Sequence, residues 1–278
     1  MEKEEFFQHY PKRKRDSNKF DNGRVFLLSG SYGMAGACIF NIIGARSAGA
    51  SYIDVCLPDT IYPIVASNEI TAVYHPDDCT DSAFLKDIPA LKKADAAAAG
   101  SGLTNHPFKK EYLKEILETV KCPVILDAEA LHILAENEGF YDLSDQMILT
   151  PHYGEFAHLV HRPLEEIREN IADLAVDLAM EKKVTLVLKG PKTLIISPSG
   201  RVHVNESGNE ALARAGSGDV LTGMMAGLCA LYHSTYPAAA DAVWLHGHLA
   251  DEAVKRHSKE VFDLTKYPEY ADRFFFER

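Results

Sequence analysis

The sequence predicts an α/β protein in which a central, mostly parallel sheet is flanked by helices on both faces. Short runs of apolar, β-branched residues alternate with longer amphipathic runs, and most of the short runs are hydrophobic throughout. Strands that are buried on both faces have this continuous pattern, and strand–helix alternation over such a length is typical of a doubly wound sheet. Glycine, charged and hydroxyl residues follow most of the predicted strands, which indicates a ligand site at one edge of the sheet.

The expected strands are spread over the first two thirds of the chain. They occupy residues 25–28, 52–57, 70–75, 95–100, 123–127, 147–150 and 184–190. The run at 95–100, "DAAAAG", is rich in alanine, which has a low β propensity. A hairpin is expected over 193–205, where "TLIIS" and "RVHVN" flank the turn "PSG".

Amphipathic runs predict the helices that connect and cover these strands. They occupy residues 35–50, 107–120, 163–183, 219–232 and 237–257. Pro163 stands where proline favours the start of a helix, and lysines end the same run. No linker, repeat or low-complexity segment divides the chain, so we expect one domain over residues 1–278.

Composition excludes several classes of protein. The net charge of −11 argues against a protein that binds nucleic acid through its phosphates, and the short basic run "PKRKR" at 11–15 is expected to be a solvated surface. The five scattered cysteines indicate reduced thiols instead of a disulfide framework. Neither a signal peptide nor a run of about 18 apolar residues is found, so we expect a cytoplasmic protein without membrane contact.

The most informative stretch is "ARAGSGDVLTGMMAGL" at residues 213–228. Gly216 and Gly218 allow close approach of the backbone to a ligand, and the helix that follows offers free N–H groups and the positive end of its dipole. Asp219 is a carboxylate inside this anion-binding turn. It could simply cap the helix, or it could act as a general base on a hydroxyl group while the amides bind a phosphoryl group.

Three further segments contribute candidate residues. "SGSYGMAGA" at 29–37 lacks the dinucleotide-binding spacing, and "KGPKT" at 189–193 is no Walker loop, although it brings two lysines to a strand end. "TPHYGE" at 150–155 supplies a histidine and a glutamate. Neither H-E-x-x-H nor G-x-S-x-G occurs, which excludes the corresponding metalloprotease and hydrolase classes.

Taken together, these segments resemble the ADP- or ATP-dependent NAD(P)H-hydrate dehydratase family, which has a ribokinase-like fold. The matching motifs, in chain order, are "GSYGMAGA" at 30–37, "GSGL" at 100–103, "DAEAL" at 127–131, "TPHYGE" at 150–155, "KGPKT" at 189–193 and "GSGDVL" at 216–221. Ser101, Thr104, Glu129 and Ala215 depart from the family pattern, which affects the binding assignments near Gly102 and Asp127.

The resemblance implies a repair reaction on hydrated NADH or NADPH. A phosphoryl group passes from ADP or ATP to the hydroxyl of the hydrated ring, and phosphate then leaves, which is easier than loss of hydroxide. Asp219 would be the catalytic base, and the residues that would touch the hydrated dinucleotide are Ala37, Gly102, His152 and Asp219. The residues that would hold the adenine nucleotide are Lys189, Gly190, Pro191, Lys192, Thr193, Gly216, Ser217 and Gly218. Glu155 would lie near Mg²⁺.

Two other functions share these residues. A ribokinase-like kinase that phosphorylates a small alcohol, such as a vitamin precursor, would use the same base and the same anion-binding turn. A non-catalytic nucleotide sensor would bind nucleotide without turnover. By analogy with the family we further expect a homo-oligomer, and no room for the epimerase domain that is often fused to its members.

Overall fold

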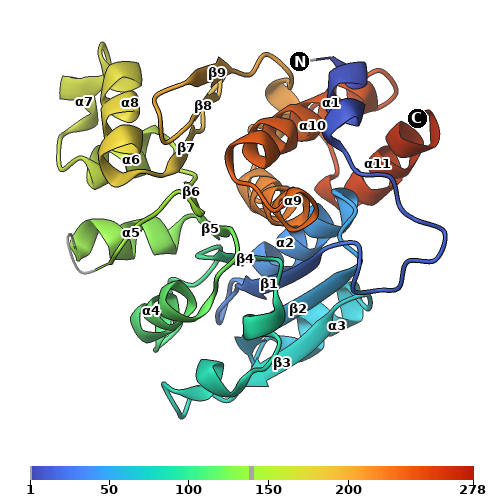
Figure 1. Ribbon diagram of the computed structural model, residues 1–278, viewed down its shortest axis with the longest axis vertical. Helices are drawn as coiled ribbons and strands as arrows, with labels where there is room; N and C mark the ends of the chain where they lie inside the picture. The colour runs from blue at the N-terminus through green and yellow to red at the C-terminus, as the bar shows by residue number, and fades with distance from the viewer. Residues whose placement is uncertain (1, 138–140) are drawn as a thin grey trace.

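The computed structural model describes residues 2–137 and 141–278, and within them a single sheet runs through the molecule (Figure 1). The sheet has nine strands in the order β3-β2-β1-β4-β5-β6-β7-β8-β9. The strands are β1 (Arg24–Leu28), β2 (Tyr52–Pro58), β3 (Val73–Asp77), β4 (Ala96–Ala99), β5 (Val124–Leu126), β6 (Met147–Leu149), β7 (Thr185–Leu188), β8 (Leu194–Ile196) and β9 (Val202–Val204).

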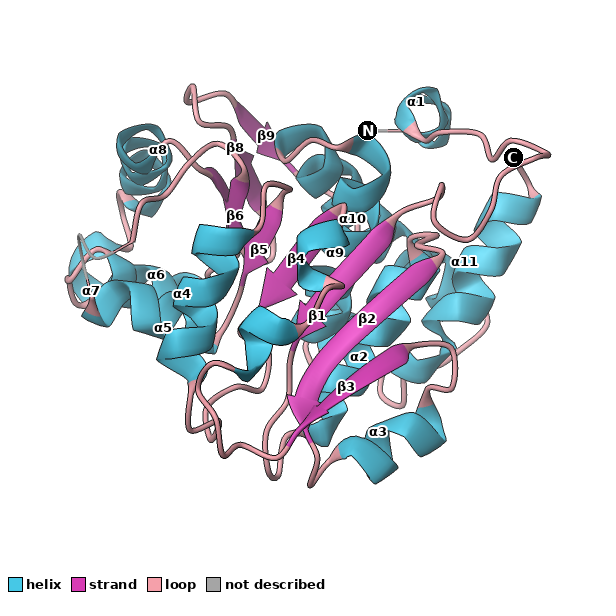
Figure 2. Ribbon diagram, turned by 60° about the horizontal axis from the view of Figure 1, so that its bottom comes forward, coloured by secondary structure: helices cyan, strands magenta, loops and turns pink. Residues whose placement is uncertain are grey.

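The strand order changes direction at β1. The chain runs outward from β1 through β2 to β3 and then returns to the other side of β1 with β4, and all pairs from β3 to β7 are parallel. Only the terminal hairpin of β8 and β9 is antiparallel to its neighbours within the described part of the chain (Figure 2). A reversal of this kind opens a crevice at the carboxyl ends of β1 and β4, where ligands bind in such sheets.

Helices cover both faces of the sheet, as the sequence predicts. One face is covered by α1 (Lys3–His9), α2 (Ala35–Ser47), α3 (Tyr62–Asn68), α9 (Ser217–Tyr232), α10 (Tyr236–Val254) and α11 (Tyr267–Phe276). The other face is covered by α4 (Lys109–Thr119), α5 (Glu129–Glu136), α6 (Tyr153–Leu159), α7 (Leu164–Ile167) and α8 (Ile171–Lys182). No helix of the described residues is long and apolar enough to cross a membrane.

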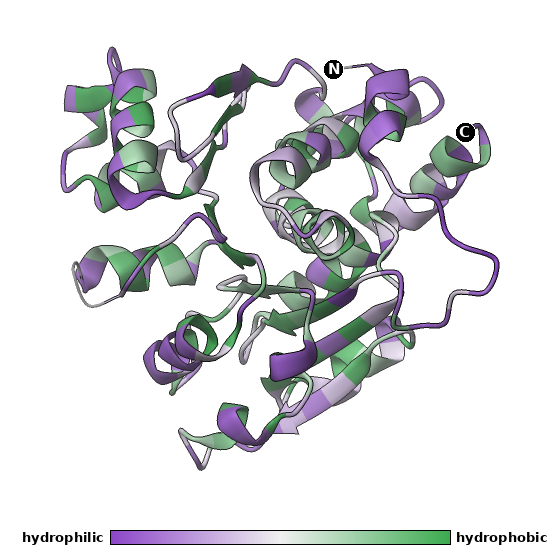
Figure 3. Ribbon diagram, in the orientation of Figure 1, coloured by the Kyte–Doolittle hydropathy of each residue, from purple (hydrophilic) through white to green (hydrophobic). Residues whose placement is uncertain are grey.

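The alternation of side chains along β1 shows why the strands are apolar throughout. Val25 and Leu27 join the core under α2 and α9, whereas Phe26 and Leu28 join the core on the opposite face. Hydrophobic residues follow the strands and the inner helix faces, while the segment between α1 and β1 is hydrophilic (Figure 3). The basic run at 11–15 lies in that segment and is exposed, which confirms its prediction as a solvated surface.

Close packing of α9 on α2 and on β4 explains why β4 consists entirely of alanine. All four alanines of β4 are buried, and small side chains here leave room for α9 to lie directly on the strand. On the other side of α9, a Cβ atom added to Gly44 of α2 would stand 2.0 Å from the carbonyl oxygen of Val220. The start of α9 is thereby fixed against the centre of the sheet.

Several predicted boundaries are wrong, for reasons that the packing shows. The predicted strand at 70–75 is displaced to β3, because Ile70 is exposed and the parallel pairing with β2 begins at Val73. The predicted helix at 163–183 is two helices, because the chain leaves helical geometry at Asn170. Four short helices were not predicted, namely α1, α3, α5 and α11. They have 7–10 residues each and are stabilised by tertiary packing more than by the helix propensity of their residues.

We expect Gly44→Ala to destabilise the fold. The added methyl group overlaps the Val220 carbonyl, so α2 and α9 must separate, which costs about 1–3 kcal/mol even after the gain in helix propensity. Gly36→Ala is the matched control, since it lies in the same helix and its Cβ atom would meet nothing within 4 Å. Urea unfolding of both variants measures the difference, and equal midpoints would contradict the packing argument.

Candidate active site

Backbone and hydroxyl hydrogen bonds join the loops that follow β1 and β4 at the crevice. The Gly30 amide donates to the Ser101 carbonyl oxygen at 2.9 Å, and the Ser29 hydroxyl donates to the same oxygen at 2.9 Å. The Ser31 hydroxyl donates to the Gly102 carbonyl oxygen at 2.6 Å. The two glycine-containing loops therefore form one surface at the carboxyl edge of the sheet.

Two of the predicted substrate-binding residues, Ala37 and Gly102, are neighbours on this surface. Gly102 has a φ of +68°, and a Cβ atom there would lie 2.8 Å from the Cβ atom of Ala37. A side chain at position 102 would thus be both strained and in collision. His152, the third predicted residue, lies at the end of β6, where its ring caps helix α6 and is 60% exposed.

Asp127 is the centre of the buried polar network behind the crevice. Its Oδ1 accepts hydrogen bonds from the Thr150 hydroxyl and the Lys189 ammonium group, both at 2.7 Å. Its Oδ2 accepts a bond from the Thr222 hydroxyl at 2.9 Å, and the Ser101 hydroxyl lies 3.5 Å away. Burial opposes ionisation of this carboxyl, yet the Lys189 charge and these hydrogen bonds hold its pKa below the ordinary value.

Lys189 connects this network to the first turn of α9. Burial opposes its charge, but Asp127 and then Glu155, whose Oε2 is 3.9 Å from Nζ, raise its pKa, so the ammonium group stays charged. A Cβ atom on Gly218 would lie 3.6 Å from the same Nζ. A partly buried cation and the amino end of a helix therefore meet at one point, which favours binding of a phosphate group.

Asp219 lies in that first turn of α9, which begins after Gly216 at a φ of +93°. Asp219 is partly buried, and its backbone carbonyl oxygen accepts a hydrogen bond from the side-chain amide of Asn41 at 2.8 Å. Burial and the charge of Asp127 raise the pKa of the Asp219 carboxyl to about 6, against the opposing effects of Ser101 and Lys189. A carboxyl group with this pKa accepts a proton more readily than an ordinary aspartate does.

Glu155 and His152 form a capping box at the start of α6. The His152 Nδ1 atom accepts bonds from the amides of Gly154 and Glu155, and the Glu155 Oε2 atom accepts the His152 amide at 2.8 Å. The other oxygen, Oε1, lies 3.5 Å from His152 Nε2. A carboxylate beside a lysine is compatible with Mg²⁺, an ion that proteins bind through one or two carboxylates together with water and substrate phosphates.

A cavity of about 570 Å³ opens next to the Lys189–Thr193 segment. Gly190, Pro191 and Thr193 line it, together with Leu221 of α9 and Val243 of α10. Its mixed lining and volume suit a heterocyclic base with its sugar. Lys192 is exposed and does not line this cavity, and neither does Lys189.

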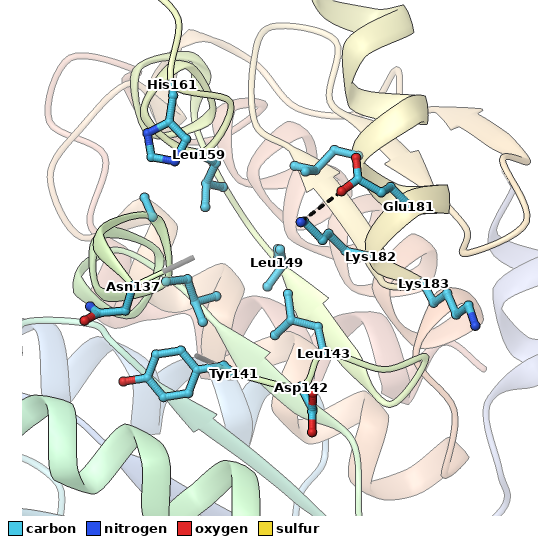
Figure 4. Close-up of a pocket in the computed structure, with 13 residues that line it drawn as sticks. Asn137, Tyr141, Asp142, Leu143, Leu149, Leu159, His161, Glu181, Lys182 and Lys183 are labelled. Atoms are coloured by element: carbon cyan, nitrogen blue, oxygen red, sulfur yellow. Dashed lines mark ion pairs between the residues drawn. The ribbon is translucent and has the colours of Figure 1, made fainter. Parts of the chain in front are cut away.

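A second cavity, of about 330 Å³, lies between α5, α6 and α8 (Figure 4). Leu143, Leu149 and Leu159 line it, and Lys182 pairs with Glu181 at its wall. None of the residues predicted for substrate, nucleotide or base lines this cavity. The candidate site is therefore the crevice at Asp219.

Comparison with known proteins settles the family. Residues 25–270 match the family model described as NAD(P)H-hydrate dehydratase. The chain belongs to this family. The chain is 33% identical over 250 residues to the ADP-dependent (S)-NAD(P)H-hydrate dehydratase of Bacillus subtilis, an alignment that covers 89% of this chain and 87% of the relative.

Solved structures agree with the family assignment. The ADP/ATP-dependent NAD(P)H-hydrate dehydratase from B. subtilis, co-crystallized with ATP/Mg²⁺, superposes with a TM-score of 0.87 at 30% identity and covers 99% of this chain and 97% of its own. A ribokinase-like superfamily protein from Enterococcus faecalis gives 0.87 at 25% identity, with 99% and 95% covered. The predicted ribokinase-like fold is thereby confirmed.

The family also includes longer proteins. The bifunctional NAD(P)H-hydrate repair enzyme of Moorella thermoacetica is 34% identical over 274 residues, which are 95% of this chain and 52% of the relative. This chain thus spans about half the length of the bifunctional repair enzymes that it matches.

Several residues of the crevice were not predicted from the sequence. Thr150 and Thr222 received no role, although both bond to Asp127, and Asn41 was not singled out. Their positions in the sequence could have indicated a role in the site, since Thr150 follows a strand and Thr222 lies one helical turn after Asp219. The cavity lining that was not predicted comprises Asn205, Ser207, Gly208, Asn209, Glu210, Leu212, Ala213, Leu221, Val243, His246 and Gly247.

We expect Asp219→Asn to stabilise the fold at alkaline pH. The folded-state pKa of Asp219 is raised to about 6, so ionisation costs the folded protein stability as pH rises from about 4 to 6, and an amide avoids that cost. The gain is about 1–2 kcal/mol, or a few degrees in Tm, at pH 8, and it nearly disappears at pH 4.

Thermal unfolding at both pH values measures this difference. Asp177→Asn, at an exposed position of α8, is the matched control and should shift Tm by less than about 1 °C. If Asp219→Asn is less stable than the wild type at pH 8, then the carboxylate is stabilised by its surroundings and the argument from burial is wrong.

Proposed function

We propose that this protein is an ADP- or ATP-dependent (S)-NAD(P)H-hydrate dehydratase that restores NADH or NADPH from their hydrated forms. The observation that carries the proposal is the meeting of three groups at one crevice: the Asp219 carboxylate, the Lys189 ammonium group and the first turn of α9. The name of the relative from B. subtilis and the ATP/Mg²⁺ of its structure support the same reaction.

The proposed mechanism begins with proton transfer to Asp219. Its carboxylate takes the proton from the ring hydroxyl of the hydrated dinucleotide while that oxygen attacks the terminal phosphoryl group of the nucleotide. An O–P bond forms to the ring oxygen and the donor's phosphoanhydride bond breaks. Departure of the ring phosphate, with loss of a proton from the neighbouring ring carbon to solvent, then forms the C=C double bond of the reduced nicotinamide.

The surrounding residues position the donor and the acceptor in this proposal. The free N–H groups of the first turn of α9, with Gly216, Ser217 and Gly218, bind the transferring phosphoryl group, and Lys189 offsets its charge. The adenosine part occupies the cavity beside Gly190, Pro191 and Thr193, and the exposed Lys192 contributes positive charge in the same segment. Ala37, Gly102 and His152 contact the hydrated dinucleotide.

Mg²⁺ would bind near Glu155 and the donor phosphates, and would neutralise phosphate charge when bound.

The family resemblance supports a homo-oligomer, and the composition supports a cytoplasmic location. The second candidate function, a kinase of a small alcohol, shares the Asp219 site and differs in its product.

We expect turnover of hydrated NADH with ADP or ATP to depend on Asp219. Asp219→Asn should lower kcat by about 10²- to 10⁴-fold, the usual contribution of a general base, with nucleotide affinity changed by less than about threefold. Return of the absorbance of reduced nicotinamide gives the rate, and calorimetry gives the affinity. Asp177→Asn is the control variant.

Each outcome of this assay has a distinct meaning. A stable phosphorylated product without recovery of reduced nicotinamide would support the kinase. Nucleotide binding without turnover in the wild type would support the sensor. Undiminished turnover in Asp219→Asn would exclude Asp219 as the base.

We also expect the rate to follow the ionisation of Asp219. The base must be deprotonated, so kcat/KM should rise with pH, reach half of its plateau near pH 6 and level off above about pH 7. Steady-state rates between pH 5 and 8 measure the profile. A flat profile across this range would contradict the role of Asp219.

A further inference from the structure

The end of β3 carries another group of ligand-type side chains, separate from the crevice at Asp219. Asp77 ends β3, Cys79 follows two residues later, and His106 lies in the loop after β4. One atom from each side chain, an oxygen, a sulfur and a nitrogen, lies within 4.8 Å of the other two. Among the residues that the structure describes, no other set of three or more such side chains meets this distance.

The distances within this group suit a tetrahedral ion. The His106 Nε2 atom lies 3.4 Å from Asp77 Oδ2 and 3.9 Å from Cys79 Sγ. Metal–sulfur bonds of about 2.3 Å and metal–nitrogen or metal–oxygen bonds of about 2.0–2.1 Å place tetrahedral ligands roughly 3.3–3.6 Å apart. Shifts of a few tenths of an ångström would therefore complete the site.

We propose that Asp77, Cys79 and His106 bind a divalent transition-metal ion of the zinc type, with water as the fourth ligand. Thiolate, imidazole and carboxylate are the donors that zinc takes in proteins, and three protein ligands with one open position are a common zinc arrangement. Asp77 and His106 are buried, while Cys79 is only half-buried, so the ion can enter past the thiol.

Neighbouring groups hold the Asp77 carboxylate in place. The Tyr112 hydroxyl donates to Oδ2 at 2.7 Å, and the Cys79 amide donates to Oδ1 at 2.8 Å. Hydrogen bonds of this kind orient the ligands of metal sites.

Metal binding requires two proton movements. Formation of the metal–sulfur bond releases the thiol proton of Cys79 to solvent. His106 Nδ1 accepts the Phe108 amide at 3.2 Å, which places the imidazole proton on Nε2. Binding at Nε2 moves that proton to Nδ1 and opens the Phe108 contact.

The ion would connect the edge of the sheet to the loop that carries Gly102. The His106 amide donates to the Leu103 carbonyl oxygen at 2.9 Å, and the Asn105 amide donates to the Ser31 hydroxyl at 3.3 Å. A metal at His106 would thus tie this part of the loop to β3, directly beside its contact with the segment after β1. This site does not depend on the proposed enzymatic function.

Cobalt titration of the reduced, metal-free protein tests the proposal. We expect one Co²⁺ per chain, with a thiolate-to-metal charge-transfer band and intense visible bands of tetrahedral geometry, and displacement of Co²⁺ by Zn²⁺. Cys79→Ser should abolish the charge-transfer band and weaken binding at least tenfold, and His106→Gln should weaken it similarly. The controls are Cys122→Ser, a half-buried cysteine outside the group, and His132→Gln, an exposed histidine.

Thermal unfolding supplies a second measurement. Zn²⁺ should raise the Tm of the wild type and of both controls, and not that of Cys79→Ser. Cys79 lies in a half-buried loop, so its serine variant keeps the test valid even if His106→Gln fails to fold. Absence of Co²⁺ binding, absence of the thiolate band, or equal affinity in Cys79→Ser would overturn the proposal.

Discussion

The site depends on the buried ion pair between Asp127 and Lys189. These residues follow β5 and β7, and the hydroxyl groups of Thr150 after β6 and Thr222 in α9 complete the coordination of the carboxylate. Such a pair loses hydration on folding and is tolerated only when its hydrogen bonds are satisfied. The network therefore fixes three strand ends and the start of α9 in one arrangement, and all of the proposed chemistry lies around it.

The same network separates the properties of two carboxyl groups. Burial opposes ionisation of Asp127, but the charge of Lys189 and hydrogen bonds from Lys189 and two hydroxyl groups lower its pKa. For the nearby Asp219, burial and the charge of Asp127 raise the pKa to about 6. Pairs of acids whose surroundings shift their pKa values in opposite directions are typical of sites that move protons. One carboxylate, Asp127, holds Lys189 in place, and the other, Asp219, is the proposed base.

Much of the fold and part of the site could be predicted from the sequence. Continuous apolar runs located the seven parallel strands within a few residues, because burial on both faces leaves that pattern, and even the alanine strand β4 was found. Helices α1, α3, α5 and α11 were not assigned, because their stability comes from contacts that are distant in sequence. The cavity beside Gly190 was missed for the same reason, since it is lined by α9, α10 and the loop after β9.

The sequence by itself determined the fold class, the family motifs and the placement of glycines, hydroxyls and charges directly after strands, because these follow from local periodicity and short spacing. Only the tertiary structure decided which of these groups meet. It placed Ala37 beside Gly102 and brought Asp77, Cys79 and His106 together. The physical reason is the reversal of strand order at β1, because contacts across it depend on how the strands pair and not on any pattern along the chain.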